Sequence, residues 1–143
     1  MRKLVALVAI AGIAGFSYLA YAAGVAHGEK KADQRVFEMR TYYAAPEKMD
    51  ALHARFRDHT CKLFQKHGMT LIGFWKPRDA KEAEKKMVYL LAFPSKDAAA
   101  KSWKGFVADP EWQAAHKASE RNGKLVDKIE SVYLDPTDYS TMQ

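Results

Sequence analysis

The chain has 143 residues, 48% of them hydrophobic and 28% charged, and its formal net charge is +6 at pH 7. This length is sufficient for one domain with its own core. Basic residues are mixed with acidic ones along the chain, so the sequence lacks the basic face typical of nucleic-acid-binding proteins, and we expect no nucleic-acid partner. Cys61 is the only cysteine, which excludes an intrachain disulfide and a metal site built from several cysteines.

The first part of the chain differs in composition from the rest. Two basic residues precede an uncharged run over residues 4–26, which contains the A-x-A pattern AYA at 20–22. This order is typical of a secretory signal peptide, so we expect residues 1–22 to be removed and the protein to be periplasmic or secreted. The run is also long enough to cross a bilayer, so the alternative is an inner-membrane anchor at residues 4–26, and only then is a membrane a partner. Residues 23–34 are a polar linker.

Residues 35–140 carry the pattern of one folded domain. Segments rich in β-branched and aromatic residues predict strands over residues 35–43, 69–75, 87–93 and 125–134. Helices are predicted between them, over residues 45–67, 95–107 and 109–122. Gly68, Ser95 and Asp109 stand at helix ends, where they are expected to act as caps. The alternating charges of KEAEKK at 81–86 indicate a solvated loop.

The order β-α-β-β-α-β predicts an α+β, ferredoxin-like fold: a four-stranded antiparallel sheet with helices on one face. The second and third strands are apolar on both faces, because Leu71 and Trp75 are predicted to point opposite to Ile72 and Phe74. The helices cover only one of these faces. An exposed apolar patch of that size is unusual in a monomer. We therefore expect a second copy of the chain to pack on the free face as a two-fold homodimer.

The stretch RFRDHTCKLFQKHG places two histidines, a cysteine and an aspartate on the first predicted helix. Metal-binding histidines on one helix are usually three or four residues apart, whereas His53, His59 and His67 are six and eight apart, so we expect no metal site. His53, Thr60 and His67 lie within the apolar stripe and are interpreted as packed polar residues, with His67 near the negative helix end. His59 lies at the edge of the stripe beside Asp58. It is the candidate catalytic residue, as a proton carrier or cofactor contact facing a cleft.

The first strand carries charge in a central position of the predicted sheet. Glu38, Arg40 and Tyr42 share one face, because side chains alternate along a strand. Half-buried charges need each other or a ligand, so one interpretation is a structural ion pair between Glu38 and Arg40. The other is that Arg40 and Tyr42 hold a ligand carboxylate or carbonyl in an aromatic pocket. The expected walls of that pocket are Trp75, Trp103 and Phe106.

Several motifs together resemble the NIPSNAP family over about residues 35–140. They are VFEMRTYYAAPEKMDAL, RFRDHTCKLFQKHGM, GFWKP, YLLAFPSKDAAAKSW, ADPEWQAA and SVYLDPTDYS. The resemblance implies a dimeric α+β barrel. It also implies distant kinship with heme-degrading and quinone-forming monooxygenases, which keep a pocket between sheet and helices. The resemblance supplies no established reaction, so whether the chain is an enzyme stays open.

Three functions are compatible with these patterns. The first is an exported homodimer that binds a small, largely apolar ligand between sheet and helices without a cofactor; its candidate ligand-binding residues are Arg40, Tyr42, His59, Trp75 and Trp103. The second is a cofactor-independent monooxygenase or heme-related oxidoreductase, with His59 as proton shuttle or axial ligand. The third is a non-catalytic interaction module. Cys61 and His116 are interpreted as ordinary helix and packing residues in all three.

Overall fold

The computed structural model describes residues 35–142 as alternating strands and helices. The strands are β1 (Val36–Ala44), β2 (Thr70–Trp75), β3 (Lys86–Phe93) and β4 (Val126–Leu134). The helical segments are α2 (Met49–Arg55), η1 (Phe56–Thr60), α3 (Cys61–Lys66), α4 (Ala80–Ala83), α5 (Lys96–Ala108) and α6 (Pro110–Ser119). The predicted signal peptide (1–22), its membrane-anchor alternative (4–26) and the linker (23–34) lie outside the described residues.

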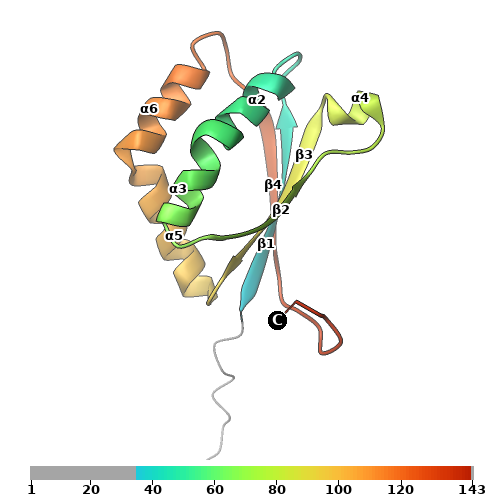
Figure 1. The fold of residues 1–143 in the computed structure, drawn as a ribbon, viewed down its shortest axis with the longest axis vertical. Coiled ribbons are helices and arrows are strands. Elements are labelled where there is room, and N and C mark those ends of the chain that lie inside the picture. Colours follow the sequence, from blue (N-terminus) through green and yellow to red (C-terminus); the bar gives the residue numbers. More distant parts are fainter. Residues whose placement is uncertain (1–34, 143) are drawn as a thin grey trace, which may run out of the picture. The chain divides into compact units, whose positions relative to one another are not determined.

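The predicted ferredoxin-like α+β fold is confirmed. All strand pairs are antiparallel, in the order β2-β3-β1-β4. Helices α2, α3, α5 and α6 form one layer on one side of this sheet (Figure 1). Because β1 is central, its residues have neighbours on both sides, and Arg40 is paired with Tyr89 of β3 and Ser131 of β4.

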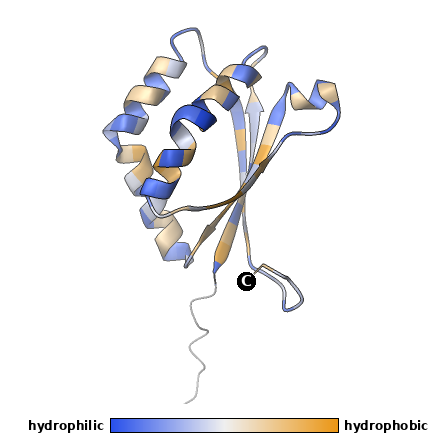
Figure 2. Cartoon of the chain, viewed as in Figure 1, coloured by the Kyte–Doolittle hydropathy of each residue, from blue (hydrophilic) through white to orange (hydrophobic). Residues whose placement is uncertain are grey.

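The core lies between the sheet and the helix layer. Strand alternation turns Glu38, Arg40 and Tyr42 toward the helices. The predicted apolar stripe of the first helix is confirmed, since each of its members is buried: Met49, Leu52, Phe56, Leu63 and Phe64. Tyr89, Leu91 and Phe93 of β3 meet these side chains from the sheet. Figure 2 shows the hydrophobic residues along the strands.

The first helix differs from the prediction at its start and in its middle. It begins at Met49 rather than at residue 45, because Glu47 has a positive φ of 61° that interrupts helical geometry. Its middle is the π-helical segment η1, where the Cys61 N–H donates to the carbonyl of Phe56, five residues earlier. The wider turn buries Phe56 and Thr60 together on the side of the sheet. Segments of this kind are frequent at functional sites.

Strand β2 contains a bulge that changes its face assignment. Leu71 pairs with Leu91, but Gly73 pairs with Leu90, so one extra residue lies between them. Leu71 and Phe74 therefore both pack on the core, and the prediction that Leu71 shares a face with Trp75 is wrong. The indole of Trp75 lies over Gly73, where an added Cβ would be 2.6 Å from the ring.

The sheet face opposite the helices, called the free face below, is apolar and open among the described residues. Trp75 of the edge strand β2 is 54% exposed, and Val132 of the opposite edge strand β4 is 49% exposed. Met39, which pairs with Val132, and Leu134 are exposed as well. The segment predicted as a charged loop is in part the short helix α4, which Asp79 caps by accepting a hydrogen bond from the Glu82 N–H.

One aspartate joins three helices at the far end of the helix layer. Asp109 caps α6 by accepting from the Glu111 N–H at 2.8 Å. Its carboxylate also lies 2.8 Å from Lys66 Nζ and 2.7 Å from His67 Nε2. Gly105 permits this approach, since a Cβ there would lie 2.8 Å from His67 Nδ1. Hydrogen bonds from Lys66 and His67 hold the pKa of Asp109 well below its usual value.

This arrangement predicts a pH-dependent loss of stability in the variant Asp109→Asn. Asparagine still caps the helix but removes the charge. Because the folded state lowers the pKa of Asp109, its carboxylate stabilises the fold above the unfolded pKa of about 4, and this contribution is lost as the pH falls further. Urea denaturation should therefore show a less stable variant at pH 5 to 7, with a difference that narrows below pH 4. Asp97→Asn, at an exposed position, is the control; a difference that stays constant down to pH 2.5 contradicts this account.

Candidate functional site

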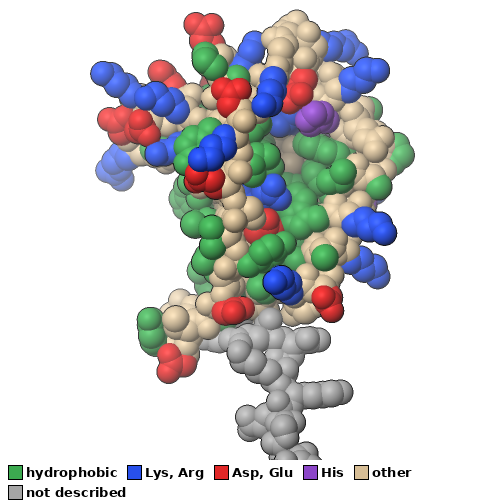
Figure 3. Space-filling model, turned by 180° about the vertical axis from the view of Figure 1, so that it is seen from behind, with side chains coloured by type: hydrophobic (Ala, Val, Ile, Leu, Met, Phe, Trp, Pro, Cys, Tyr) green, Lys and Arg blue, Asp and Glu red, His purple; other side chains and the backbone are tan. Residues whose placement is uncertain are grey.

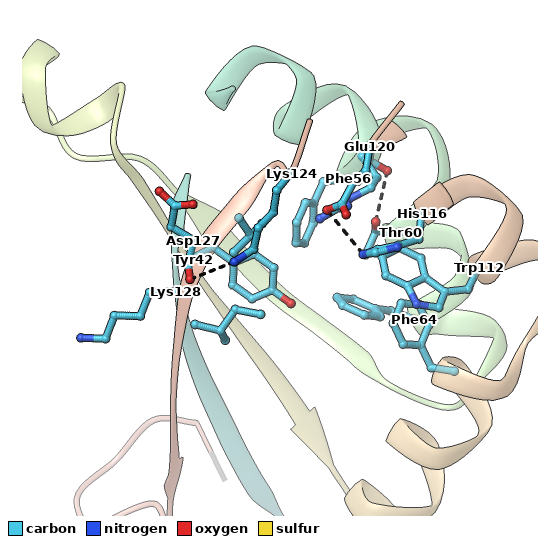
Figure 4. Close-up of a pocket in the computed structure, with 14 residues that line it drawn as sticks. Tyr42, Phe56, Thr60, Phe64, Trp112, His116, Glu120, Lys124, Asp127 and Lys128 are labelled. Atoms are coloured by element: carbon cyan, nitrogen blue, oxygen red, sulfur yellow. Dashed lines mark hydrogen bonds and ion pairs between the residues drawn. The ribbon is translucent and has the colours of Figure 1, made fainter. Parts of the chain in front are cut away.

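A cavity of about 440 Å³ lies between the helix layer and the β1–β4 side of the sheet. Figure 4 shows how side chains from both layers point into it. The lining residues are Tyr42, Arg55, Phe56, Thr60, Phe64, Phe106, Trp112, His116, Glu120, Lys124, Val126, Asp127, Lys128 and Ile129. Figure 3 shows the hollow from behind, with hydrophobic side chains on its floor and charged side chains around it.

The inner wall of the cavity is a row of aromatic rings on the helix layer. Phe56, Phe64, Phe106 and Trp112 follow one another, and the ring centres of the last two pairs are 4.8 and 4.4 Å apart. Tyr42 stands across from this row on the sheet, with its ring centre 5.6 Å from that of Phe56. Its hydroxyl points toward the space between the two layers (Figure 4). The wall is therefore apolar, with one hydroxyl facing it.

The outer part of the cavity is polar and centres on a buried arginine. The Arg55 side chain is only 3% exposed, and its Nη1 lies 3.3 Å from both Glu120 Oε1 and Ser119 Oγ. The same Glu120 oxygen lies 3.5 Å from His116 Nε2 and accepts from the Leu125 N–H at 3.4 Å. The Arg55 Nε–H has no hydrogen-bond partner within residues 35–142.

The position of Arg55 follows from the π-helical segment. Thr60 donates from Oγ1 to the backbone carbonyl of Arg55 at 3.2 Å. The Arg55 guanidinium then lies 5.5 Å from the centre of the Trp112 ring, where a cation is attracted by the ring face. His116 packs against the same tryptophan at a tilt of 57°, with ring centres 5.4 Å apart. The mouth of the cavity thus combines an aromatic platform with an arginine, a histidine and a glutamate.

The rim is formed by the connection from α6 to β4. Lys124 Nζ makes a long contact of 3.5 Å with the backbone carbonyl of Asp127 and has no carboxylate partner among the described residues. Lys128 Nζ lies 2.6 Å from Glu130. Lys124 is therefore a cation at the mouth that forms no ion pair within the described part of the chain.

A second polar cluster lies on the same sheet face, beside the cavity. Glu38 is 2% exposed and accepts from Trp103 Nε1 and from Ser131 Oγ, each at 2.5 Å. Arg40 Nη1 lies 3.4 Å from the same carboxylate, and its guanidinium lies 4.2 Å from the centre of the Trp103 ring. The structure thus contains the ion pair that the sequence predicts and adds Ser131 to it. Two hydrogen bonds and one ion pair compensate the buried charge of Glu38.

Tyr89 is the buried neighbour of this cluster. It pairs with Arg40 across β1 and β3, and its side chain is fully buried. Its hydroxyl has no hydrogen-bond partner within residues 35–142. Burial, reinforced by the nearby Tyr42, raises the pKa of Tyr89 well above its usual value, so the hydroxyl stays protonated.

The structure brings three of the five predicted ligand-binding residues to the helix-facing side of the sheet. Tyr42 lines the cavity, and Arg40 and Trp103 form the adjacent cluster. Trp75 is not among them, because the bulge in β2 turns it to the free face. His59 is exposed on η1 and lines a shallow depression near Ala115 and Ser119 rather than the cavity with Tyr42.

Sequence reasoning missed the polar mouth of the cavity. Arg55 was not singled out because it lies among the apolar residues of the first helix, and its partner Glu120 is 65 residues away. His116 was interpreted as a packing residue. A usable signal existed in the spacing of Trp112, His116 and Glu120, which recur every four residues and so share one helix face.

The described part of the chain contains neither a metal-binding cluster nor a membrane-spanning helix. Within residues 35–142, no three His, Cys, Asp or Glu side chains come together as a metal site would require. No helix in the same range has the length and hydrophobicity needed to cross a bilayer.

The Glu38 cluster predicts that the charge of this residue stabilises the fold. Glu38→Gln keeps the shape but removes the charge that pairs with Arg40, and it leaves one carbonyl oxygen where two charged oxygens accepted the hydrogen bonds of Trp103 and Ser131. Removing one partner of a buried ion pair typically costs about 3 kcal/mol or more, so we expect a loss of about that size in urea denaturation. Glu130→Gln, which removes an exposed partner of Lys128, is the matched control and should cost much less. Equal losses in the two variants would show that Glu38 is not structural.

Known proteins share this fold and match the sequence of the domain. The NIPSNAP family model matches residues 37–141. A NIPSNAP family protein of unknown function from Agrobacterium tumefaciens is 22% identical, with a TM-score of 0.66, over 78% of this chain and 96% of its own. An uncharacterized NIPSNAP-like domain protein from Burkholderia xenovorans is 18% identical, with a TM-score of 0.65, over 76% of this chain and 90% of its own. No curated protein sequence matches the chain. Since the family model covers most of its length, the chain belongs to the NIPSNAP family.

Proposed function

We propose that the protein binds a small, largely apolar ligand in the cavity between its sheet and its helix layer. The volume of about 440 Å³ lies within the range of roughly 300–1,000 Å³ usual for small-molecule sites. Such sites combine apolar and aromatic walls with a few polar groups, as the row from Phe56 to Trp112 and the Tyr42 hydroxyl do here.

The observation that carries this proposal is the open space that Tyr42, the aromatic row and strand β4 border. Protein interiors are normally close-packed, whereas the rings that line this hollow leave part of their apolar surface in contact with water. The side chains that frame the space are held by other interactions: Tyr42 by Tyr89, and Trp112 by Phe106 and His116. A ligand that fills the space would cover that apolar surface.

An exported homodimer is the form in which we propose that this site acts. The apolar free face supports a second copy, since Trp75, Val132 and their exposed neighbours would be covered by a sheet-on-sheet contact. The A-x-A pattern at residues 20–22 supports export to the periplasm or beyond.

An oxidoreductase is the second candidate, and the observation that favours it is an imidazole in the cavity. That imidazole belongs to His116, which faces Glu120 at 3.5 Å, and not to His59. A proton carrier at this place would act on a ligand lying against Trp112. The described residues do not fit an axial heme site, because His116 Nε2 is turned to Glu120 and His59 is outside the cavity. The cavity makes a purely structural interaction module the weaker account.

Ligand binding is tested by filling the cavity from its rim. Ile129 lines the cavity and is 44% exposed, so Ile129→Trp narrows the space with little cost to folding. We expect wild-type protein to enhance the fluorescence of the neutral apolar probe N-phenyl-1-naphthylamine, and the variant to bind it at least tenfold more weakly. Val107→Trp is the control, because Val107 is exposed on α5 and lines no part of the cavity. Equal binding by both variants would place the probe elsewhere.

The homodimer is tested on two residues of β4, three positions apart, that face opposite sides of the sheet. Val132 lies on the free face and Ile129 on the helix side, and both are exposed in the single chain. Val132→Glu places a charge in the proposed interface, so sedimentation velocity should show monomers at micromolar concentration. Ile129→Glu should remain dimeric. A wild-type protein that sediments as a monomer would refute the proposed dimer.

A further inference from the structure

We propose that the ligand of this cavity is a lipophilic monocarboxylic acid, whose carboxylate binds Arg55 at the mouth while its apolar body lies along the aromatic row. This inference rests on the proposed ligand-binding function and specifies the chemical class of the ligand. It follows from the missing hydrogen-bond acceptor of the Arg55 guanidinium, from the charges around the mouth of the cavity and from the apolar wall beyond that mouth.

The guanidinium of Arg55 has an edge without partners. Within residues 35–142, its hydrogen bonds to Ser119 and Glu120 both start from Nη1. Its Nε–H has no acceptor, although the side chain is almost completely buried. A buried donor without an acceptor is unfavourable. The Nε side of a guanidinium matches the two oxygens of a carboxylate, and Arg55 lines the cavity, so an entering carboxylate that reaches this edge would supply the missing acceptors.

The negative charge of Glu120 does not fully compensate the positive charge of Arg55. Glu120 Oε1 is shared among Arg55, His116 and the Leu125 N–H. Lys124 adds a second cation at the mouth without a carboxylate partner among the described residues. A carboxylate head entering the cavity would therefore meet Arg55 from inside and Lys124 from the rim.

The same surroundings limit the charge and shape of the head. The carboxylates of Glu120 and Asp127 also line the mouth. They would repel a doubly charged phosphate, whereas Arg55 and Lys124 balance the single charge of a carboxylate. Beyond the head, the space is bordered by the aromatic row, by Val126 and Ile129, and by the Tyr42 ring with its single hydroxyl. The ligand thus has one acidic end and an apolar remainder.

A matched series of ten-carbon compounds tests this class. Decanoate, decanol, decylamine and decyl phosphate are compared for their ability to displace N-phenyl-1-naphthylamine from the purified protein. We expect decanoate to compete at least tenfold more strongly than each of the other three. Equal competition by decanoate and decanol would overturn the carboxylate assignment and leave the cavity site standing. If none of the four compounds displaces a bound probe, the carboxylate assignment is likewise overturned; if the probe itself does not bind, the proposed function fails as well.

Variants of Arg55 and Lys124 test whether these two cations cause the preference for decanoate over decanol. Arg55→Gln should abolish the advantage of decanoate over decanol, and Lys124→Gln should reduce it about threefold while leaving decanol binding unchanged. Lys62→Gln, at an exposed position of α3 outside the cavity, is the control. Lys124 is exposed, so its variant tests the proposal even if Arg55→Gln does not fold. An advantage that survives intact in Lys124→Gln, or in a folded Arg55→Gln, overturns the proposal.

Discussion

The structure depends on how it accommodates charge on the helix-facing side of its central strand. Strand alternation sends Glu38, Arg40 and Tyr42 under the helix layer, where an uncompensated charge would be strongly destabilising. Trp103 of α5 and Ser131 of β4 supply the hydrogen bonds that Glu38 requires. These contacts fix α5 against the centre and one edge of the sheet. The cavity opens next to this fixed point, where Tyr42 faces the aromatic row.

Two polar groups therefore frame one apolar space. The Glu38 carboxylate is satisfied by protein donors and acts as structure, whereas Arg55 lines the mouth of the cavity. Within residues 35–142 the Nε–H groups of both Arg40 and Arg55 have no acceptor, but only Arg55 borders the cavity. The π-helical turn connects the two roles, because it buries Phe56 in the wall and Thr60 against the carbonyl of Arg55. Membership of the NIPSNAP family gives the fold but no reaction, so the function is argued from this site.

The sequence predicted the fold well because hydrophobic period and strand composition determine it. The prediction was wrong where a single residue interrupts the regular spacing of an element. The bulge in β2 turns Trp75 to the free face, and the positive φ of Glu47 makes the first helix begin later than predicted. The site was predicted only in part. Tyr42 followed from alternation along one strand, but the pairing of Arg55 with Glu120 joins two helices distant in sequence, and no local pattern reports such a contact.

The central claim is that a small apolar acid enters the space between the two layers. Methyl NMR spectra of isoleucine- and valine-labelled protein, recorded during a titration with decanoate, locate such a ligand directly. We expect the methyl signals of Val126 and Ile129 to move in a saturable way, while those of Val132 on the free face stay in place. Shifts confined to Val132 and its neighbours, or no shifts at all, would contradict it.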